Sequence, residues 1–409
     1  MRTINLFEQE KSPISGWGLT AEELQMLVEF SEKHQERYFS VSRRHLISKN
    51  YVGRVQVGGL CLQILPKNGE KNDPHIQTGL TQMLLYTQVL PDIKTQKTPS
   101  RVALGELWEY YVHLLAQETQ RLAKKGLLKQ YEQPNSNQPR WANHIDWSKH
   151  ININACRPAY FYGQRWELNS NHFYNQIIAK AIDTVCRQKW SDATQKGLKI
   201  AQFAISHVII PAQVSEKEFN QIVFNRHNAE YKLVLELSRF VLLNLNPQMM
   251  SGNHFALSFW VEMPTLFEKY IKKQLHESCI KANWGFEYQK KLSFWKNQPQ
   301  KPDFKIKNTQ KSYILDAKWK NPQSATANGD DLRQMFTYGV LSEASELLLI
   351  YPQVGENYQI IEDFFQKTTT TTEGEKKMRL KLIFIQLWDK KGGLNLQNGD
   401  RLVAEMKKN

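Results

Sequence analysis

Apolar and polar residues alternate with two different periods along this 409-residue chain, and the changes of period divide it into three regions. In residues 1–95 both periods occur. Apolar residues recur at helical spacing after Thr20, which is a favourable N-cap residue. Residues 54–64 alternate with a period of two on both sides of Gly58-Gly59, which indicates two strands joined by a tight turn. We therefore predict an α+β N-terminal region.

Helical spacing dominates residues 96–249, with apolar stripes of which the first begins at Leu104. We predict a helix-rich middle region in which most aromatic residues belong to the core. The polar stretch 130–140 predicts a surface loop, although Lys129 and Arg140 at its ends are also candidate phosphate contacts.

Residues 160–175 hold several aromatic side chains interleaved with Arg165. Interleaved aromatic and arginine residues occur on surfaces that bind nucleic acid, where bases stack on the rings. The same pattern also fits buried packing, so both interpretations stay open from the sequence.

The C-terminal region, residues 250–409, changes repeatedly between helical and strand periodicity. An apolar helical stripe follows Pro264, which is tolerated in a first turn, and a second helix is predicted from Asp330. The predicted strands are residues 302–307, 313–319, 346–352 and 380–388, and the threonine-rich residues 367–377 are predicted to be a flexible loop. We expect a mixed central sheet flanked by helices.

Two aspartates and a lysine stand at one end of the predicted hairpin. Asp303 and Asp316 carry hard oxygen donors that suit Mg²⁺. Lys318 follows Asp316 by two positions, so in a strand both side chains point to the same face. A carboxylate-held Mg²⁺ generates hydroxide and neutralises the charge that builds up on a phosphodiester during hydrolysis. The motif therefore predicts a metal-dependent nuclease site, with a solvated hairpin as the plainer interpretation.

Polar side chains on the two flanking helices are candidates for the same site. Glu268 borders the apolar stripe of the first helix, where it is either a solvated carboxylate or a further contact for metal or water. Gln334 and Tyr338 are four residues apart and so share one face of the second helix. Asp330 and Asp331 suit the N-terminal end of that helix.

The balance of charge favours a polyanionic partner. The chain has 54 lysine and arginine residues against 40 aspartate and glutamate residues, and its formal net charge is +14. Each contact between a basic side chain and a phosphate releases a counterion, so a surplus of this size suits nucleic acid. The alternative is a basic protein whose charge serves solubility.

Several absences narrow the functional classes. The sequence contains no G-x-x-x-x-G-K-[ST] phosphate loop and no G-x-G-x-x-G fingerprint, so any nucleotide hydrolysis is expected from a partner. The four cysteines show no C-x-x-C spacing, which argues against a zinc site or a disulfide framework. No apolar run reaches the roughly 18 residues of a membrane span, and no signal-peptide core is present. We expect a cytoplasmic protein.

Taken together, these residues resemble a known family. The motifs that look like the PD-(D/E)xK nuclease domain are Phe267-Glu268, Pro302-Asp303, Asp316-Ala317-Lys318, Gln334-Met335 and Tyr338. More narrowly, the whole chain is similar to the McrC family, the nuclease subunit of McrBC-type, modification-dependent (type IV) restriction systems. Looser motifs at residues 51–67, 144–147, 167–178 and 225–231 follow the order expected of that family.

The resemblance implies an α/β, restriction-endonuclease-like fold for residues 250–409. It also implies Mg²⁺-dependent cutting of double-stranded DNA that carries a modification such as 5-methylcytosine, as a defence against phage. The expected metal contacts are Asp303, Asp316, the Ala317 carbonyl and Glu268. Lys318 is expected to position or deprotonate the attacking water, while Gln334 and Tyr338 support the site or touch DNA.

The resemblance further implies a partner, a ring-shaped AAA+ GTPase hexamer of the McrB type. This partner would bind GTP and carry most of the target recognition, and residues 1–95 are the candidate docking region. Two alternatives remain from the sequence. One is a non-catalytic activator or adaptor of an AAA+ motor, and the other is a stand-alone DNA repair nuclease.

Overall fold

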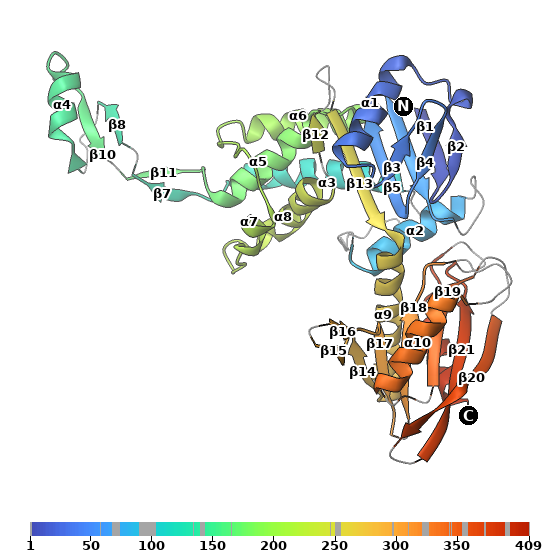
Figure 1. Cartoon of the computed structure of the whole chain (residues 1–409). Helices are drawn as coiled ribbons and strands as arrows, with labels where there is room; N and C mark the ends of the chain where they lie inside the picture. Colours follow the sequence, from blue (N-terminus) through green and yellow to red (C-terminus); the bar gives the residue numbers. More distant parts are fainter. Residues whose placement is uncertain are drawn as a thin grey trace. The chain divides into compact units, whose positions relative to one another are not determined.

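A computed structural model gives the fold of the chain. It describes residues 2–57, 59–67, 74–89, 104–133, 135–139, 144–164, 166–245, 247–249, 255–296, 298–309, 311–320, 327–342, 344, 346–353, 359–371, 374–388 and 393–408. The chain forms two compact units, of which one comprises Met1–Glu106 with Met249–Asn409 and the other comprises Leu107–Gln248 (Figure 1). The first unit therefore joins the two ends of the sequence.

The N-terminal part of the first unit is α+β, as predicted. Its larger sheet has the order β1-β6-β5-β13-β12, with strands β1 (Arg2–Phe7), β6 (Leu60–Leu65), β5 (Tyr51–Val57), β13 (Phe255–Glu262) and β12 (Pro247–Met249). A smaller sheet contains β2 (Lys11–Pro13), β4 (His45–Ser48) and β3 (Phe39–Val41), and the helices are α1 (Ala21–Lys33) and α2 (Pro74–Tyr86). Thr20 caps α1 in a capping box. Val57 pairs with Leu60 across the predicted tight turn, of which Gly58 lies outside the described residues.

Strand β13 connects this sheet directly to the C-terminal part. It pairs antiparallel with β5 along its length. Helix α9 (Met263–Ala282) begins at the residue after β13, with Pro264 in its first turn as predicted. The two strands approach closely at Gly53, whose φ is +144° and where a Cβ atom would lie 1.9 Å from the Phe259 carbonyl oxygen. Only glycine allows this approach.

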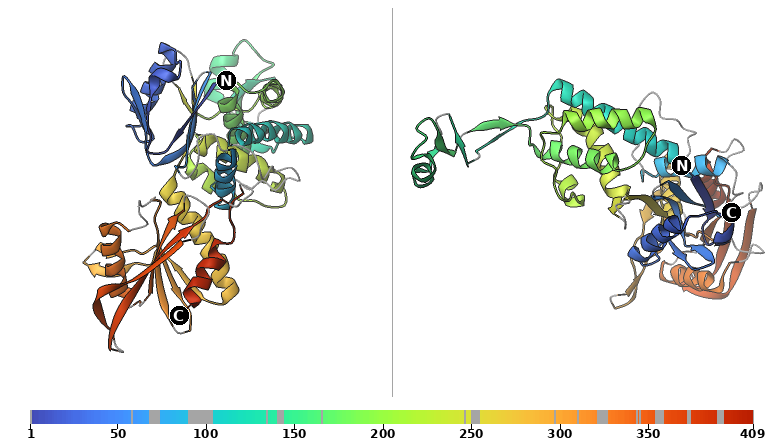
Figure 2. Two further views of the ribbon diagram at one scale, coloured as in Figure 1. Left: turned by 90° about the vertical axis from the view of Figure 1, so that its right-hand side faces the viewer. Right: turned by 90° about the horizontal axis from the view of Figure 1, so that it is seen from above.

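The C-terminal part is built on a mixed sheet with the order β14-β17-β18-β19-β21-β20. Its strands are β14 (Gly285–Tyr288), β17 (Phe304–Lys307), β18 (Ser312–Ala317), β19 (Glu346–Pro352), β21 (Gly374–Ile385) and β20 (Gln359–Thr371). Strands β18, β19 and β21 run parallel, and the outer pairs are antiparallel. Helix α10 (Gly329–Ser342) covers one face, and α9 with α11 (Asn398–Lys407) covers the other (Figure 2). The predicted mixed sheet between helices is confirmed.

Alternation along β18 decides which face its polar end presents. Ile314 packs with Met335 of α10 in one core cluster. Tyr313 points to the opposite face, where its hydroxyl donates to the Met406 carbonyl oxygen of α11. Because successive side chains of a strand alternate, Asp316 lies on the α10 side with Ile314.

The prediction of a flexible loop at residues 367–377 is wrong. These residues belong to the β20–β21 hairpin, in which Thr368 pairs with Lys377 and Thr371 pairs with Gly374. Threonine is β-branched and favours strands, so a run of this residue extends the hairpin. Thr372 and Glu373 lie outside the described residues.

Helices dominate the second unit, as predicted. They are α3 (Leu104–Lys125), α4 (Trp147–Asn154), α5 (Phe173–Cys186), α6 (Asp192–Ala204), α7 (Glu216–Asn220) and α8 (Lys232–Arg239). Trp108 and Tyr111 of α3 are buried, in agreement with the predicted core role of aromatic residues. Short strands also occur, namely β7 (Gln130–Glu132), β8 (Asn135–Gln138), β9 (His144–Ile145), β10 (Phe161–Gln164) and β11 (Glu167–Asn169).

Two predictions for this unit need correction. The stretch 130–140 is not one loop, because it contains β7 and β8, and its Arg140 lies outside the described residues. Of the aromatic residues at 160–175, Tyr174 is buried, but Tyr160 and Trp166 are exposed. Buried packing therefore explains only part of that cluster, whose Arg165 lies outside the described residues.

A buried polar network fixes the centre of the second unit. The Asn175 amide donates to the carbonyl oxygens of Leu128 and Ser170, both at 2.8 Å, and its Oδ1 accepts from the Tyr231 hydroxyl at 2.9 Å. The Tyr231 hydroxyl accepts in turn from the Leu128 backbone N–H at 2.8 Å. Asn175 and Tyr231 belong to the looser motifs of the sequence. Through these hydrogen bonds they attach the segment around Leu128 to α5 and to the start of α8.

None of the helices in the described part of the chain has the length and apolar content needed to cross a bilayer. All four cysteines are free thiols.

Candidate active site

The hairpin of β17 and β18 brings the two predicted aspartates to one end of the sheet. Phe304 pairs with Leu315, so Asp303 precedes β17 beside the end of β18. The backbone N–H of Ala317 donates to Asp303 Oδ2 at 2.8 Å. This bond fixes the Asp303 carboxylate beside the strand that carries Asp316.

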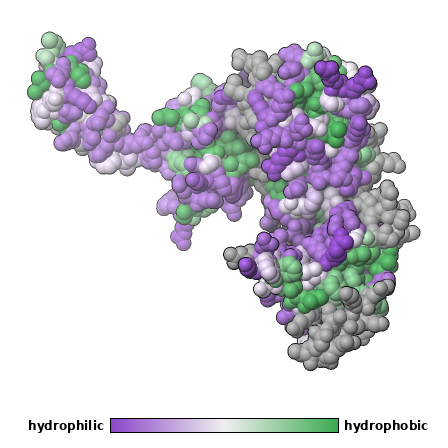
Figure 3. Space-filling model, viewed as in Figure 1, coloured by the Kyte–Doolittle hydropathy of each residue, from purple (hydrophilic) through white to green (hydrophobic). Residues whose placement is uncertain are grey.

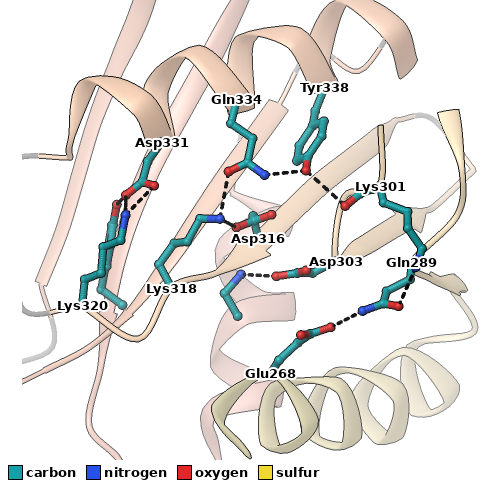
Figure 4. Close-up of polar contacts among 12 residues, drawn as sticks. Glu268, Gln289, Lys301, Asp303, Asp316, Lys318, Lys320, Asp331, Gln334 and Tyr338 are labelled. Carbon is teal, nitrogen blue, oxygen red and sulfur yellow. Dashed lines mark hydrogen bonds and ion pairs between the residues drawn. The ribbon is translucent and has the colours of Figure 1, made fainter. Parts of the chain in front are cut away.

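Lys318 joins Asp316 to helix α10. Its Nζ lies 2.6 Å from Asp316 Oδ2 and donates to Gln334 Oε1 at 2.8 Å (Figure 4). The Gln334 amide donates to the Tyr338 hydroxyl at 2.6 Å, and that hydroxyl donates to the Lys301 carbonyl oxygen at 3.1 Å. The structure thus places Gln334 and Tyr338 in one hydrogen-bonded chain that orients the lysine.

Glu268 approaches the same place from α9. Its Oε1 accepts from the Gln289 amide at 2.8 Å, and the Gln289 backbone N–H donates to the Asp303 carbonyl oxygen at 2.8 Å. The Lys301 ammonium donates to the side-chain oxygen of Gln289, Oε1, at 3.2 Å. Gln289 therefore links the Glu268 carboxylate to the Asp303 segment, a role that was not predicted. A glutamine in a turn after β14 gives no sequence signal of such a contact.

Asp331 is a second residue whose role in the site was not predicted. The sequence indicates only a favourable residue at the start of α10, but its side chain is buried. The Lys320 ammonium donates to both of its carboxylate oxygens, at 2.8 and 2.9 Å, and the Tyr351 hydroxyl donates to Oδ2 at 3.1 Å. Asp331 and Gln334 lie three residues apart on the face of α10 that points at the sheet. The exposed Asp330 keeps the predicted position at the helix start.

Negative charge accumulates where these elements meet. Burial, followed by the nearby Asp316 and Glu268 carboxylates, raises the pKa of Asp303 to about 8. Burial also raises the pKa of Asp316, against the opposing effect of Lys318. For Lys318, burial lowers the pKa, but the nearby carboxylates of Asp316, Asp303 and Asp331 together outweigh burial and the net pKa is raised. Lys318 thus offsets only part of the repulsion among these carboxylates, and the raised pKa means that Asp303 keeps a proton near neutral pH when no cation is bound.

The side chains present fit a divalent cation. Asp316 is only 1% exposed, and its Oδ2 lies 2.6 Å from the Lys318 ammonium. Carboxylate oxygens are hard donors, and a cation would relieve the repulsion that raises the pKa of Asp303. Within the described ranges, no three His, Cys, Asp or Glu side chains are grouped tightly enough to hold a metal by themselves. Mg²⁺ commonly takes one or two carboxylates and keeps several waters, so this donor set suits it.

A cavity of about 550 Å³ opens onto the cluster. Glu268, Asp303 and Lys318 line it from the C-terminal part of the unit. Side chains of the N-terminal part also line it, and these are Gln9, Asn50 and Lys67. The site is therefore open to a ligand, and its walls come from both ends of the sequence.

Comparison with known proteins identifies the family. A sequence model of the family described as "McrBC 5-methylcytosine restriction system component" matches residues 46–352. The chain belongs to the McrC family. The match includes every residue of the site from Glu268 to Tyr338, as well as the looser motifs from residue 51 onward. The predicted family is thereby confirmed.

A solved structure agrees with this family at the level of the fold, and a second structure is similar over part of the chain. One is the half-complex from a tetradecameric assembly of Thermococcus gammatolerans McrB AAA+ hexamers with bound McrC, with a TM-score of 0.68 and 18% identity. The alignment covers 99% of this chain and 100% of that chain. Another is the McrBC complex of the same organism, with a TM-score of 0.46 and 17% identity over 68% of this chain and 88% of that chain. No curated protein matches the chain.

Proposed function

We propose that this McrC family member is the Mg²⁺-dependent DNA endonuclease subunit of a GTP-dependent restriction complex that acts on modified DNA. The observation that carries the proposal is the cluster of Asp303, Asp316 and Lys318 at the open cavity, with carboxyl pKa values raised by burial and mutual repulsion. A structural ion pair would hold its carboxylate ionised and satisfied, whereas burial and repulsion disfavour the charged form of Asp303 here, and a bound cation would favour that form.

The arrangement of elements supports assignment of the C-terminal part to the PD-(D/E)xK class. The antiparallel β17–β18 hairpin carries Asp303 and Asp316 at one end, and the parallel strand β19 follows after α10. Helix α9 adds Glu268 from the opposite face of the sheet. This is the order that the sequence motifs predict for a nuclease domain.

Asp303 and Asp316 would hold the metal, with the Ala317 carbonyl oxygen and Glu268 as further contacts. Bound Mg²⁺ would stabilise negative charge on the phosphoryl oxygens and lower the pKa of a nearby water. Glu268 is held by Gln289 beside the Asp303 segment, where its carboxylate can accept a proton from water or orient it.

Lys318 is expected to act as a charged hydrogen-bond donor. Its raised pKa keeps it protonated at neutral pH, so it stabilises charge on the phosphoryl group and orients the attacking water without serving as the base. Gln334 and Tyr338 act through this lysine. Their hydrogen-bonded chain limits the rotamers of Lys318 and so holds its ammonium in place.

Cleavage assays on the purified chain, alone and with its GTPase partner, test this function. Methylated and unmethylated duplex DNA would be incubated with Mg²⁺ and GTP, and the products resolved on gels. We expect cutting that Asp316→Ala abolishes. Asp330→Ala is the matched control, because Asp330 lies in the first turn of the helix that carries Gln334 but its side chain is exposed. Cutting that survives Asp316→Ala would disprove the assignment.

We further propose that the partner is an McrB-like AAA+ GTPase hexamer. The second unit exposes apolar side chains that support a docking role, among them Trp147 at 61%, Ile151 at 64% and Trp166 at 54% exposure. Figure 3 shows apolar residues gathered on the segment that carries α4. The chain thus has two candidate docking regions, this surface and residues 1–95. Docking by residues 1–95 stays a prediction.

Variants of the same surface, assayed for both GTPase stimulation and DNA cutting, distinguish a nuclease subunit from an adaptor without nuclease activity. Replacement of Trp147 and Ile151 by serine should abolish copurification with the GTPase and stimulation of GTP hydrolysis. Phe203→Ser in α6 is the control, because Phe203 is 82% exposed but lies on another helix. GTPase stimulation without any DNA cutting by the intact chain would favour the adaptor, and strong cutting without partner or nucleotide would favour a stand-alone repair nuclease.

A further inference from the structure

The N-terminal part of the first unit contributes three polar side chains to the wall of the active-site cavity, and the proposed catalysis uses none of them. They are Gln9 in the turn after β1, Asn50 in the turn before β5, and Lys67 just beyond β6. Lys67 also ends the motif at residues 51–67 that the family resemblance includes. The role of these residues is open.

Hydrogen bonds connect the three side chains in a row. The Lys67 ammonium donates to Gln9 Oε1 at 3.0 Å, and the Gln9 amide donates to Asn50 Oδ1 at 2.5 Å. The Asn50 carbonyl oxygen accepts from the backbone N–H of Met263 at 3.1 Å. Met263 is the first residue of α9, so the row is tied to the helix that carries Glu268.

A second connection holds Lys67 opposite the catalytic strand. The Lys67 backbone N–H donates to Glu8 Oε1 at 3.2 Å, and the Trp319 indole N–H donates to the same oxygen at 2.5 Å. Glu8 is buried, and Trp319 follows Lys318 directly. The position of Lys67 relative to Lys318 is therefore set by packed side chains and not by the surface alone.

The lysines that line the cavity differ in whether a carboxylate pairs with their ammonium group. Lys318 pairs with Asp316 and Lys320 pairs with Asp331. Lys67 makes no ion pair among the described residues: its ammonium donates to the neutral Gln9 amide, and the buried Glu8 carboxylate acts on it only by charge at a distance. Since an ammonium has three hydrogens, Lys67 keeps donors for a ligand, and the exposed Asn50 adds an amide group beside it. The wall thus offers positive charge and N–H donors opposite the carboxylates.

We propose that Lys67, Gln9 and Asn50 form a phosphate-binding subsite for the DNA backbone, which takes a phosphate next to the one that is cut. The proposal rests on the proposed nuclease function. A strand whose scissile phosphate reaches Asp303 must pass through the cavity that these residues line, and its neighbouring phosphates need cationic partners there. The N-terminal part of the unit then binds substrate as well as supporting the fold.

Salt-dependent DNA binding tests the subsite. Binding of the full chain to a fluorescent duplex would be measured by anisotropy over a range of salt concentrations, for the native chain and for Lys67→Gln. Loss of one phosphate contact should weaken binding several-fold and reduce the slope of log K against log salt by about 0.9. Lys67→Arg should restore both values. Lys11→Gln is the control, because Lys11 is exposed on β2 of the same part and lines no part of the cavity.

A second variant avoids dependence on the buried contacts around Lys67. Asn50 is exposed, so Asn50→Asp should fold normally while it adds a negative charge to the wall and weakens DNA binding. In cleavage assays, both variants should raise KM with little change in kcat, because the subsite binds ground state and transition state alike.

The outcomes separate the two proposals. An unchanged salt slope and an unchanged KM in both Lys67→Gln and Asn50→Asp would overturn the subsite, even if the native chain cuts DNA and Asp316→Ala does not. A chain that shows the expected salt slopes but never cuts would overturn the nuclease and leave the subsite in place. No DNA binding by the native chain would overturn the subsite.

Discussion

Each compact unit contains a cluster of buried polar side chains, and the two clusters differ in how their polar groups are satisfied. In the second unit, Asn175 and Tyr231 meet only neutral partners, and four hydrogen bonds satisfy them. In the first unit, Asp303 and Asp316 repel each other and Lys318 balances only part of their charge. A satisfied buried network stabilises a fold, whereas an unbalanced one lowers stability and persists where a ligand completes it.

The largest expected effect concerns Lys318. Lys318→Met should reduce cleavage roughly 10²–10³-fold, because it removes a charged donor aimed at the reacting group. The control is Lys311→Met, which breaks another ion pair of the same sheet, that between Lys311 and the buried Glu346. That variant should lower stability but leave cleavage by the folded protein unchanged. Equal loss of cleavage in both variants would mean that Lys318 is only structural.

Metal binding should depend on pH in the first unit. An unfolded aspartate has a pKa of about 3.9, whereas the pKa of Asp303 in the folded chain is raised to about 8. Between these values the folded state holds a proton that the unfolded state has lost, so the free energy of unfolding falls as pH rises. Mg²⁺ should restore about 2.7 kcal/mol at a hundredfold excess over its Kd near pH 8, and much less near pH 5.

Thermal unfolding with Mg²⁺ and with EDTA measures this effect. Asp303→Asn removes the charge but keeps an oxygen that can accept the Ala317 N–H, so it should flatten the pH dependence and abolish the shift caused by Mg²⁺. A shift that is equal at both pH values, or that persists in Asp303→Asn, would place the metal elsewhere.

Substitution in the polar cluster of the second unit should change stability but leave the effects of Mg²⁺ unchanged. Asn175→Ala should reduce the free energy of unfolding by about 2 kcal/mol, because it leaves buried partners such as the Leu128 carbonyl oxygen without a hydrogen bond. Urea unfolding followed by circular dichroism measures the loss. The Mg²⁺-induced thermal shift and the Mg²⁺ dependence of cleavage should not change. A change in either would show that the two clusters are coupled and that the contrast between them is wrong.

The smallest effect is expected at the residues that orient Lys318. Gln334→Ala should lower cleavage about 10-fold, in the range found when a partner of a site residue is removed. Tyr338→Phe should have a smaller effect, because Gln334 would still contact Lys318 directly. Initial rates at saturating DNA measure both. A larger loss for Tyr338→Phe than for Gln334→Ala would contradict the proposed order of contacts.

Local pattern was sufficient for much of the fold and for the centre of the site. The Asp303–Asp316 pair was predictable because one hairpin fixes its register, and Lys318 because side chains alternate along a strand. The α9 and α10 helices were recognised from apolar spacing and from their first turns. The threonine run was mistaken for a loop because its low hydrophobicity concealed the strand preference of threonine.

The sequence by itself predicted the central residues of the candidate site, because the contacts between them lie within a short hairpin whose geometry is local. Only the tertiary structure decided what surrounds them. Gln289 reaches Glu268 across a turn, Asp331 is buried against Lys320, and Lys67 lines the cavity from the opposite end of the chain. No periodicity encodes these contacts, because they depend on how β13 and α9 bring together segments that are distant in the sequence.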